Sequence, residues 1–230
     1  MSSSTQDVRI AVDAVQSVSG LFDTPDTPTA CYVLAHGAGA GMRHPFLTAV
    51  ATELCALGIA TLRFQFPYME KGSRRPDRPE LCHATVRAAV ARAASLAPSL
   101  PLFAGGRSFG GRMASQAQAA APLSGVRGLI FLGFPLHLAG KPSIARAEHL
   151  FQVKVPLLFL QGTDDELARL DLLRPLVQRL GEHATLTLFE HADHSFHVPA
   201  RSGRKDPEVR AEVLRALVEW VARVIRASST

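Results

Sequence analysis

The sequence predicts an α/β fold: a mostly parallel central sheet of about seven to eight strands, with helices on both faces. The first observation behind this prediction is that short apolar segments alternate with longer helical patterns from residue 30 onward. The second is that several short segments, such as 126–134, are almost entirely apolar, which is typical of strands buried on both faces. With 230 residues, the chain is long enough for one domain with its own core, so we expect a single domain over residues 1–230.

The N-terminal half of the chain predicts four strands and two helices. Asp and Pro residues at 23–28 fix a turn after the second strand, and Gly58 ends the first helix. An irregular basic loop, 67–79, follows the fourth strand. The predicted strands are 8–12, 15–22, 30–35 and 60–66, and the predicted helices are 46–56 and 81–90.

The C-terminal half continues the alternation. We expect Asp206 to cap the last helix, with Pro207 at its first position. Residues 135–152 are irregular and too few for a helical lid, so no large cap domain is expected. The predicted strands are 101–104, 126–134, 156–160 and 185–189, and the predicted helices are 109–120, 167–180 and 207–226.

Composition excludes several classes of protein. The apolar runs are far shorter than the roughly 20 residues that span a bilayer, and the N-terminus lacks the pattern of a signal peptide, so no membrane partner is expected. The net charge is +5, but the chain is only 7% aromatic and has no nucleic-acid-binding motif, which argues against nucleic acid as a partner. Cys31, Cys55 and Cys82 form no C-x-x-C motif, which favours reduced, buried thiols in a cytoplasmic protein. Nothing indicates the oligomeric state.

A Gly-x-Ser-x-Gly pattern lies between the strand 101–104 and the helix 109–120. Side chains two positions before and after Ser108 would collide in so sharp a turn, and Gly106 and Gly110 remove that collision. The serine hydroxyl would then be exposed at a helix N-terminus, whose free N–H groups favour a developing oxyanion. The alternative is a glycine-rich turn in which Ser108 is only a helix cap.

A second glycine-rich loop, 36–41, follows the strand 30–35. Here the backbone N–H of Ala38, together with that of Phe109, would form an oxyanion hole. A phosphate-binding loop is the rival interpretation, but no Lys-Ser/Thr pair follows and the glycine spacing differs. A simple flexible turn stays open as an alternative. His36 is interpreted as a structural residue that holds the loop.

A serine hydroxyl needs a histidine base, and the histidine needs a carboxylate that fixes its tautomer. Acidic residues and histidines follow the last two predicted strands, and the chain supplies Ser108, Asp165 and His194 in the order known for serine nucleophiles in this motif. The alternatives are Asp164 for the acid, and His191 and His197 for the base.

These segments carry a family resemblance. The sequence resembles the α/β-hydrolase superfamily, and more narrowly the small, lidless dienelactone-hydrolase-like branch that includes testis-expressed protein 30-like and KAT8 regulatory complex subunit 3-like proteins. In that superfamily the acid usually lies three residues after the glycine that ends its strand, which implies Asp165, and the Asp-His-Ser-Phe pattern implies His194. The matching segments are Leu34-Ala-His-Gly-Ala-Gly, Arg63-Phe-Gln-Phe-Pro-Tyr-Met-Glu, Gly105-Gly-Arg-Ser-Phe-Gly-Gly-Arg, Phe134-Pro-Leu-His, Leu160-Gln-Gly-Thr-Asp-Asp-Glu-Leu and Ala192-Asp-His-Ser-Phe.

The resemblance implies a serine hydrolase that cleaves a small ester or thioester through an acyl-enzyme. Its partner would be a small-molecule acyl substrate, and no metal or other cofactor is required. A non-catalytic interaction module is an alternative, because some relatives are scaffold subunits, and an acyltransferase is another.

Several residues near the predicted site are candidates for contact with substrate. An arginine can bind an anionic group with two hydrogen bonds. The plainer interpretation is a solvated basic loop that contains Arg74, Arg75 and Arg78, with Arg63 paired to a surface carboxylate. A satisfied loop histidine is likewise the plainer interpretation of His137. For Arg112, one turn along the helix, we consider a structural role. The substrate-binding candidates are Gly37, Gly39, Arg63, Tyr68, Arg107 and His137.

Overall fold

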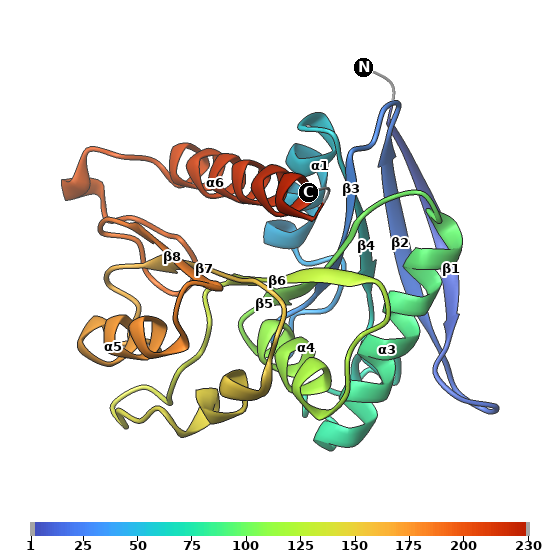
Figure 1. Ribbon diagram of the computed structural model, residues 1–230, viewed down its shortest axis with the longest axis horizontal. Coiled ribbons are helices and arrows are strands. Elements are labelled where there is room, and N and C mark those ends of the chain that lie inside the picture. Colours follow the sequence, from blue (N-terminus) through green and yellow to red (C-terminus); the bar gives the residue numbers. More distant parts are fainter. Residues whose placement is uncertain (1–2, 229–230) are drawn as a thin grey trace.

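The computed structural model describes residues 3–228 and contains an eight-stranded sheet (Figure 1). The strand order is β1-β2-β4-β3-β5-β6-β7-β8, and only the β1–β2 and β2–β4 pairs are antiparallel. The fold class predicted from the sequence is therefore confirmed. The strands are β1 (Ser3–Ala11), β2 (Ser17–Pro25), β3 (Ala30–Ala35), β4 (Ile59–Phe64), β5 (Leu102–Arg107), β6 (Val126–Leu132), β7 (Leu157–Gly162) and β8 (Ala184–Phe189).

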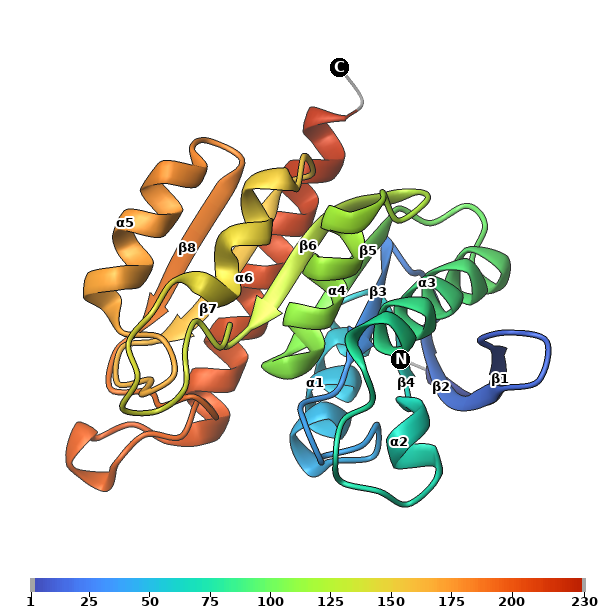
Figure 2. The same ribbon diagram turned by 90° about the horizontal axis from the view of Figure 1, so that it is seen from below.

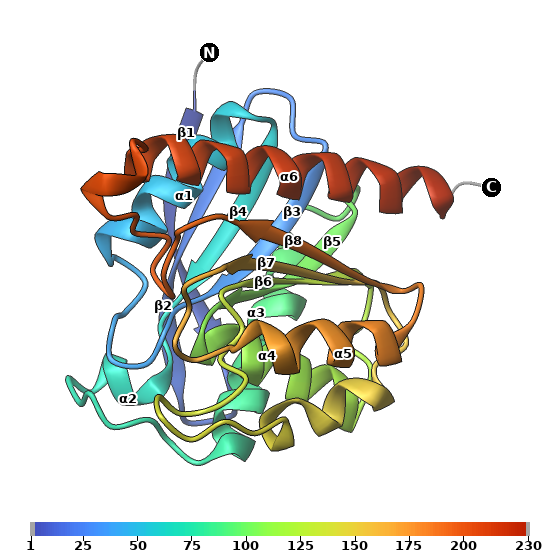
Figure 3. The same cartoon turned by 90° about the vertical axis from the view of Figure 1, so that its left-hand side faces the viewer.

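Helices cover both faces of the sheet (Figures 1 and 3). One face packs against α1 (Pro45–Ala56) and α6 (Asp206–Ala227), with a core that includes Leu47 and Trp220. The other face carries α3 (Pro79–Leu96), α4 (Phe109–Ala120), α5 (Leu170–Leu180) and the 3₁₀ helix η1 (Ala145–Gln152), which lie in front in Figure 2. Every residue of β3, β4 and β7 is buried, as strands between two helical layers require.

Element boundaries differ from the predictions at informative places. β5 continues through Arg107, where the sequence predicts a turn at 105–108, because Gly105 and Gly106 let the strand pass very close to its neighbours. The predicted Asp206 cap is wrong. Lys205 is the N-cap residue, and the Asp206 carboxylate accepts hydrogen bonds from the N–H of Val198 and the ring of His197.

The connection between β6 and β7 holds only loop and η1, so the described residues contain no large cap domain. Two short elements complete the chain: α2 (Pro67–Glu70) after β4 and η2 (Ala200–Ser202) before α6. No helix within residues 3–228 combines the length and hydropathy needed to cross a bilayer.

The parallel strands determine where the site forms. β3, β5, β7 and β8 all end at the same edge of the sheet, so the loops that follow them meet there although they are far apart in sequence. These loops carry Ala38, Ser108, Asp165 and His194.

Candidate active site

Ser108 lies in a strained turn between β5 and α4. Its φ is 50° and its ψ is −117°, a conformation that non-glycine residues rarely adopt. The close approach of the neighbouring strand β3 explains why positions 106 and 110 are glycines. A Cβ atom at position 106 would lie 2.2 Å from the carbonyl oxygen of Ala35, and one at position 110 would lie 2.6 Å from the same oxygen. The steric explanation of the Gly-x-Ser-x-Gly pattern therefore holds in three dimensions.

A hydrogen-bonded chain joins the three residues that the sequence singled out. Nε2 of His194 lies 2.7 Å from Oγ of Ser108, and Nδ1 lies 2.7 Å from Oδ2 of Asp165. The Asp165 side chain is fully buried. An ionised carboxylate only accepts hydrogen bonds, so Nδ1 of His194 donates to it and Nε2 is left to accept the serine proton.

The alternative acid and bases are not part of this hydrogen-bonded chain. Asp164 is exposed and accepts a hydrogen bond from the hydroxyl of Thr163, 3.0 Å away. The rings of His191 and His197 are not hydrogen-bonded to Ser108, and His197 pairs instead with Asp206 at 2.9 Å. The geometry thus brings together Ser108, Asp165 and His194 and none of the three alternatives.

Gln161, at the end of β7, supports the acid and was not singled out from the sequence. Its side-chain amide donates to Oδ2 of Asp165, while its carbonyl oxygen accepts from the N–H of Phe134 at 2.9 Å. The N–H of Leu167 donates to the other carboxylate oxygen at 2.8 Å. The Asp165 carboxylate is therefore held by three donors, counting His194. The sequence held a signal for this role: Gln161 immediately precedes Gly162, the strand-ending glycine from which the position of Asp165 was counted.

The two predicted oxyanion-hole donors flank Ser108. Within residues 3–228, neither the N–H of Ala38 nor that of Phe109 has a protein acceptor. Phe109 is the first residue of α4, where the helix leaves its N–H groups free. Ala38, Ser108 and Phe109 line one cavity of about 390 Å³. Gly37 lies beside the serine as well, since a Cβ there would be 3.9 Å from that of Ser108.

Comparison with known proteins agrees with this architecture. A family model described as alpha/beta hydrolase domain matches residues 28–222. The chain belongs to the alpha/beta hydrolase family. It is also similar in structure to a lidless α/β serine hydrolase from Xanthomonas campestris (TM-score 0.73, 22% identity, 94% of each chain covered). A dienelactone hydrolase from Anabaena variabilis has a TM-score of 0.76 at 21% identity, with 96% of this chain and 98% of that chain covered. At these identities the likeness concerns the fold.

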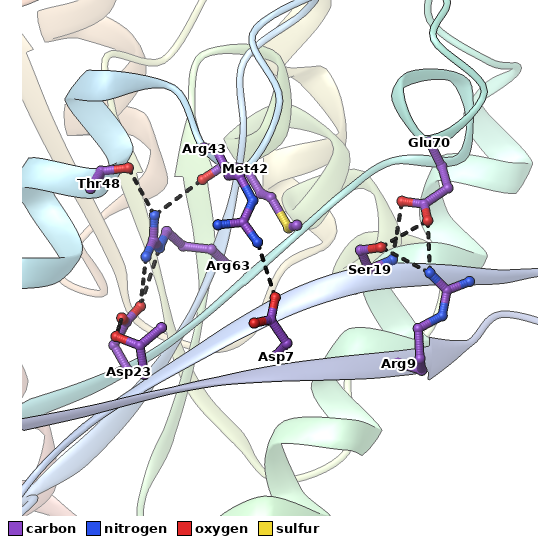
Figure 4. Close-up of polar contacts among 10 residues, drawn as sticks. Asp7, Arg9, Ser19, Asp23, Met42, Arg43, Thr48, Arg63 and Glu70 are labelled. Atoms are coloured by element: carbon purple, nitrogen blue, oxygen red, sulfur yellow. Dashed lines mark hydrogen bonds and ion pairs between the residues drawn. The ribbon is translucent and has the colours of Figure 1, made fainter.

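In this alpha/beta hydrolase, Arg63 is not available for the substrate contact considered from the sequence. The side chain is buried and its donors are occupied (Figure 4). Its Nε and one terminal nitrogen lie 3.2 and 2.9 Å from Oδ2 of Asp23. The other terminal nitrogen donates to the carbonyl of Met42 and the hydroxyl of Thr48. Asp23 lies on β2, the antiparallel neighbour of β4, so the pair joins two strands of the sheet. The role of Arg63 is structural.

This ion pair gives a stability prediction. Asp23→Ala leaves a buried, unpaired guanidinium, and we expect it to lower the free energy of unfolding by about 3–5 kcal/mol. The matched control is Asp7→Ala, which removes the partner of Arg43 from an exposed pair; this change should cost less than about 1 kcal/mol. The measurement is urea unfolding of both variants. Equal losses would show that burial of the Arg63 pair is not what matters.

Tyr68 and His36 hold the loop that contains Ala38. The hydroxyl of Tyr68 accepts a hydrogen bond from the N–H of Gly39 at 3.3 Å, and its ring is buried, so the expected substrate contact is not found. Burial lowers the pKa of His36 to about 4, which keeps the ring neutral. Its Nε2 accepts from the N–H of Phe66, and Nδ1 donates to the carbonyl of Gly37. The structural interpretation of His36 is confirmed.

His137 and Arg107 also support loops. Both ring nitrogens of the buried His137 are occupied, Nδ1 by the carbonyl of Leu138 and Nε2 by the N–H of Arg169, so it fastens the loop after Asp165 and is not free for substrate. Arg107 donates to Oγ of Ser195 at 2.7 Å, next to His194, and stacks over the ring of Phe46. Neither side chain lines the cavity at Ser108.

The arginines of the basic loop 67–79 contribute little charge to the site. Arg74, Arg75 and Arg78 are exposed and do not line the cavity at Ser108, in keeping with the solvated-loop interpretation. Two other arginines do line it, Arg112 and Arg146. Among residues 3–228, no three side chains of His, Cys, Asp or Glu converge as a metal site requires.

Proposed function

We propose that this member of the alpha/beta hydrolase family is a serine hydrolase that cleaves a small ester or thioester through an acyl-enzyme. The observation that carries the proposal is the continuous chain of hydrogen bonds from the buried Asp165 through His194 to Ser108, with both links at 2.7 Å. Such a chain makes a serine oxygen nucleophilic at neutral pH.

The reaction begins when Oγ of Ser108 attacks the substrate carbonyl carbon and its proton passes to Nε2 of His194. Asp165 stabilises the imidazolium that forms. The negative charge on the carbonyl oxygen is held by the N–H groups of Ala38 and Phe109, which have no acceptor within residues 3–228. His194 then gives its proton to the departing alcohol or thiol, and the acyl group remains on Ser108.

A water molecule completes the cycle. His194 removes one of its protons, the hydroxide oxygen attacks the acyl carbon, and Ser108 leaves with the proton returned by His194. The carboxylic acid is the second product. The cavity volume of about 390 Å³ favours small acyl groups, since it lies at the low end of ligand pockets.

The narrower relationship is part of this proposal. The sequence motifs favour the dienelactone-hydrolase-like branch with testis-expressed protein 30-like and KAT8 regulatory complex subunit 3-like proteins, some of which serve as scaffolds. We favour an enzyme because a scaffold has no need for the Ser108–His194–Asp165 chain. Cys31, Cys55 and Cys82 are buried free thiols, which supports the proposal of a cytoplasmic location.

A panel of p-nitrophenyl esters and acyl thioesters of increasing chain length tests the proposal. We expect turnover of short-chain members without any added cofactor, and loss of that turnover in Ser108→Ala. Transfer of the acyl group to an added alcohol or amine in preference to water would favour the acyltransferase alternative. Turnover that persists in Ser108→Ala would reject the mechanism, and a wild-type protein inert toward the panel would favour the interaction module.

A further inference from the structure

The cavity at Ser108 is lined by two arginines that come from different elements. Arg112 lies one helical turn after Ser108 on α4, and its N–H donates to the carbonyl of Ser108 at 3.1 Å. Arg146 lies on η1, which packs against α4. Ala38, Phe109 and Asp77 are among the other residues that line it. The cationic side chains are thus placed in the same cavity as the nucleophile.

The guanidinium of Arg112 has no polar partner within residues 3–228. Its Nε is buried without an acceptor, and no carboxylate of the described chain forms an ion pair with it. Its one identified contact is with the ring of Phe109, 5.9 Å from Cζ to the ring centre. Burial and then the charge of Arg146 lower the pKa of Arg112. An arginine in this position is a donor group without an acceptor.

Arg146 is also incompletely satisfied. One terminal nitrogen donates to the carbonyl of His137 at 3.2 Å, which anchors the side chain, and no ion pair within residues 3–228 includes it. Both residues are half-buried, so water reaches part of each side chain, but even partial desolvation of a charge is offset best by an anionic partner. Two neighbouring guanidinium groups without an anionic partner in the described chain, one of them with a buried Nε that has no acceptor, suggest that the partner is a ligand.

The other arginines near the site are unsuited to binding an anionic ligand. Arg63 is paired with Asp23, and Arg107 is bonded to Ser195. The carboxylate that lines the same cavity is Asp77, one oxygen of which is buried without a donor. The three ionisable groups that line the cavity, Arg112, Arg146 and Asp77, therefore sum to a charge of +1, which one singly charged anion neutralises.

We propose that Arg112 and Arg146 bind a carboxylate of the substrate, so that the preferred substrates are esters or thioesters of a dicarboxylic acid or another monoanionic acyl compound. Guanidinium groups match the planar carboxylate with paired hydrogen bonds. A doubly charged phosphate would exceed the cavity charge. The inference rests on the proposed function in one respect: it assigns the bound carboxylate to a substrate that Ser108 attacks. Binding of the anion by the two arginines does not depend on that reaction.

The test uses two substrates that differ mainly in charge: mono-p-nitrophenyl glutarate, which carries a free carboxylate, and its methyl ester, which is neutral and one methyl group larger. The quantity compared is the ratio of kcat/KM for the anion to that for the neutral ester, with p-nitrophenolate release as the readout. We expect Arg112→Gln and Arg146→Gln each to lower this ratio about 10- to 100-fold, the effect of losing a hydrogen bond to a charged group. Arg215→Gln on the exposed surface of α6 is the control, with the same charge change and an unchanged ratio.

Anion binding is also measured without turnover. Calorimetric titration of the Ser108→Ala protein with mono-p-nitrophenyl glutarate should show a Kd that weakens about 10- to 100-fold when Arg112→Gln is added. Equal ratios in wild type and both arginine variants, or a Kd that Arg112→Gln leaves unchanged, would overturn the proposal. Failure of the proposed function has a different signature, namely no turnover of either ester.

Discussion

Asp165→Asn is expected to lower kcat for a p-nitrophenyl ester by about 10⁴-fold, the loss typical of a triad whose acid becomes an amide. The carboxylate accepts from Nδ1 of His194, and Oδ2 also accepts from the side chain of Gln161. An amide can offer His194 an N–H group in place of an acceptor, which favours the tautomer with the proton on Nε2. That tautomer cannot take the proton of Ser108.

Asp164→Asn is the matched control, with the same substitution one residue earlier. Asp164 is exposed and contacts Thr163, so kcat should stay within about twofold of the wild-type value. Both variants are assayed with saturating substrate at the same pH. Comparable losses in the two variants would contradict the assignment of Asp165 as the acid.

Gly106→Ala is expected to lower the free energy of unfolding by more than about 4 kcal/mol, or to prevent folding. The added Cβ would lie 2.2 Å from the carbonyl oxygen of Ala35, far inside normal contact, and φ at this position is +149°. The carbonyl belongs to the neighbouring strand β3, so neither group can move without separating β3 from β5. Urea unfolding, or the soluble yield when no folded protein is recovered, measures the effect.

Gly72→Ala separates strain from collision. Gly72 also has a positive φ, +75°, but nothing lies within 4 Å of an added Cβ. Only the conformational cost applies there, about 1–2 kcal/mol. If Gly106→Ala were no more destabilising than Gly72→Ala, close strand packing would not be the reason for glycine at position 106.

The hydrogen-bonded arrangement of Ser108, His194 and Asp165 could be predicted because its signals are local. Ser108 lies in a strand-turn-helix motif, and Asp165 and His194 follow strands in a fixed chain order. Parallel strands then bring the three loops to one edge of the sheet, whatever the separation in sequence. The sequence therefore contained enough information to choose these residues without knowing side-chain positions.

The local environment of the substrate-contact candidates was hardest to predict where it depends on pairing between distant segments. Arg63 was a candidate for substrate contact, with a surface carboxylate as the alternative partner. β2 places the buried Asp23 beside it, and strand register in an antiparallel pair is not evident from either strand alone. Arg112 was considered only for a structural role and Arg146 was not singled out, because η1 meets α4 only in the folded chain. Local motifs predict the hydrogen-bonded chain on which the proposed chemistry rests, whereas the proposed specificity rests on contacts that only tertiary packing creates.

The central claim is that Oγ of Ser108 is the activated nucleophile, and covalent labelling tests it most directly. A fluorophosphonate probe is incubated with the folded protein, and the modified residue is located by peptide mass spectrometry. We predict stoichiometric modification of Ser108, which disappears in Ser108→Ala and falls strongly in His194→Ala. Modification of a different residue, or labelling that persists in Ser108→Ala, would contradict the account.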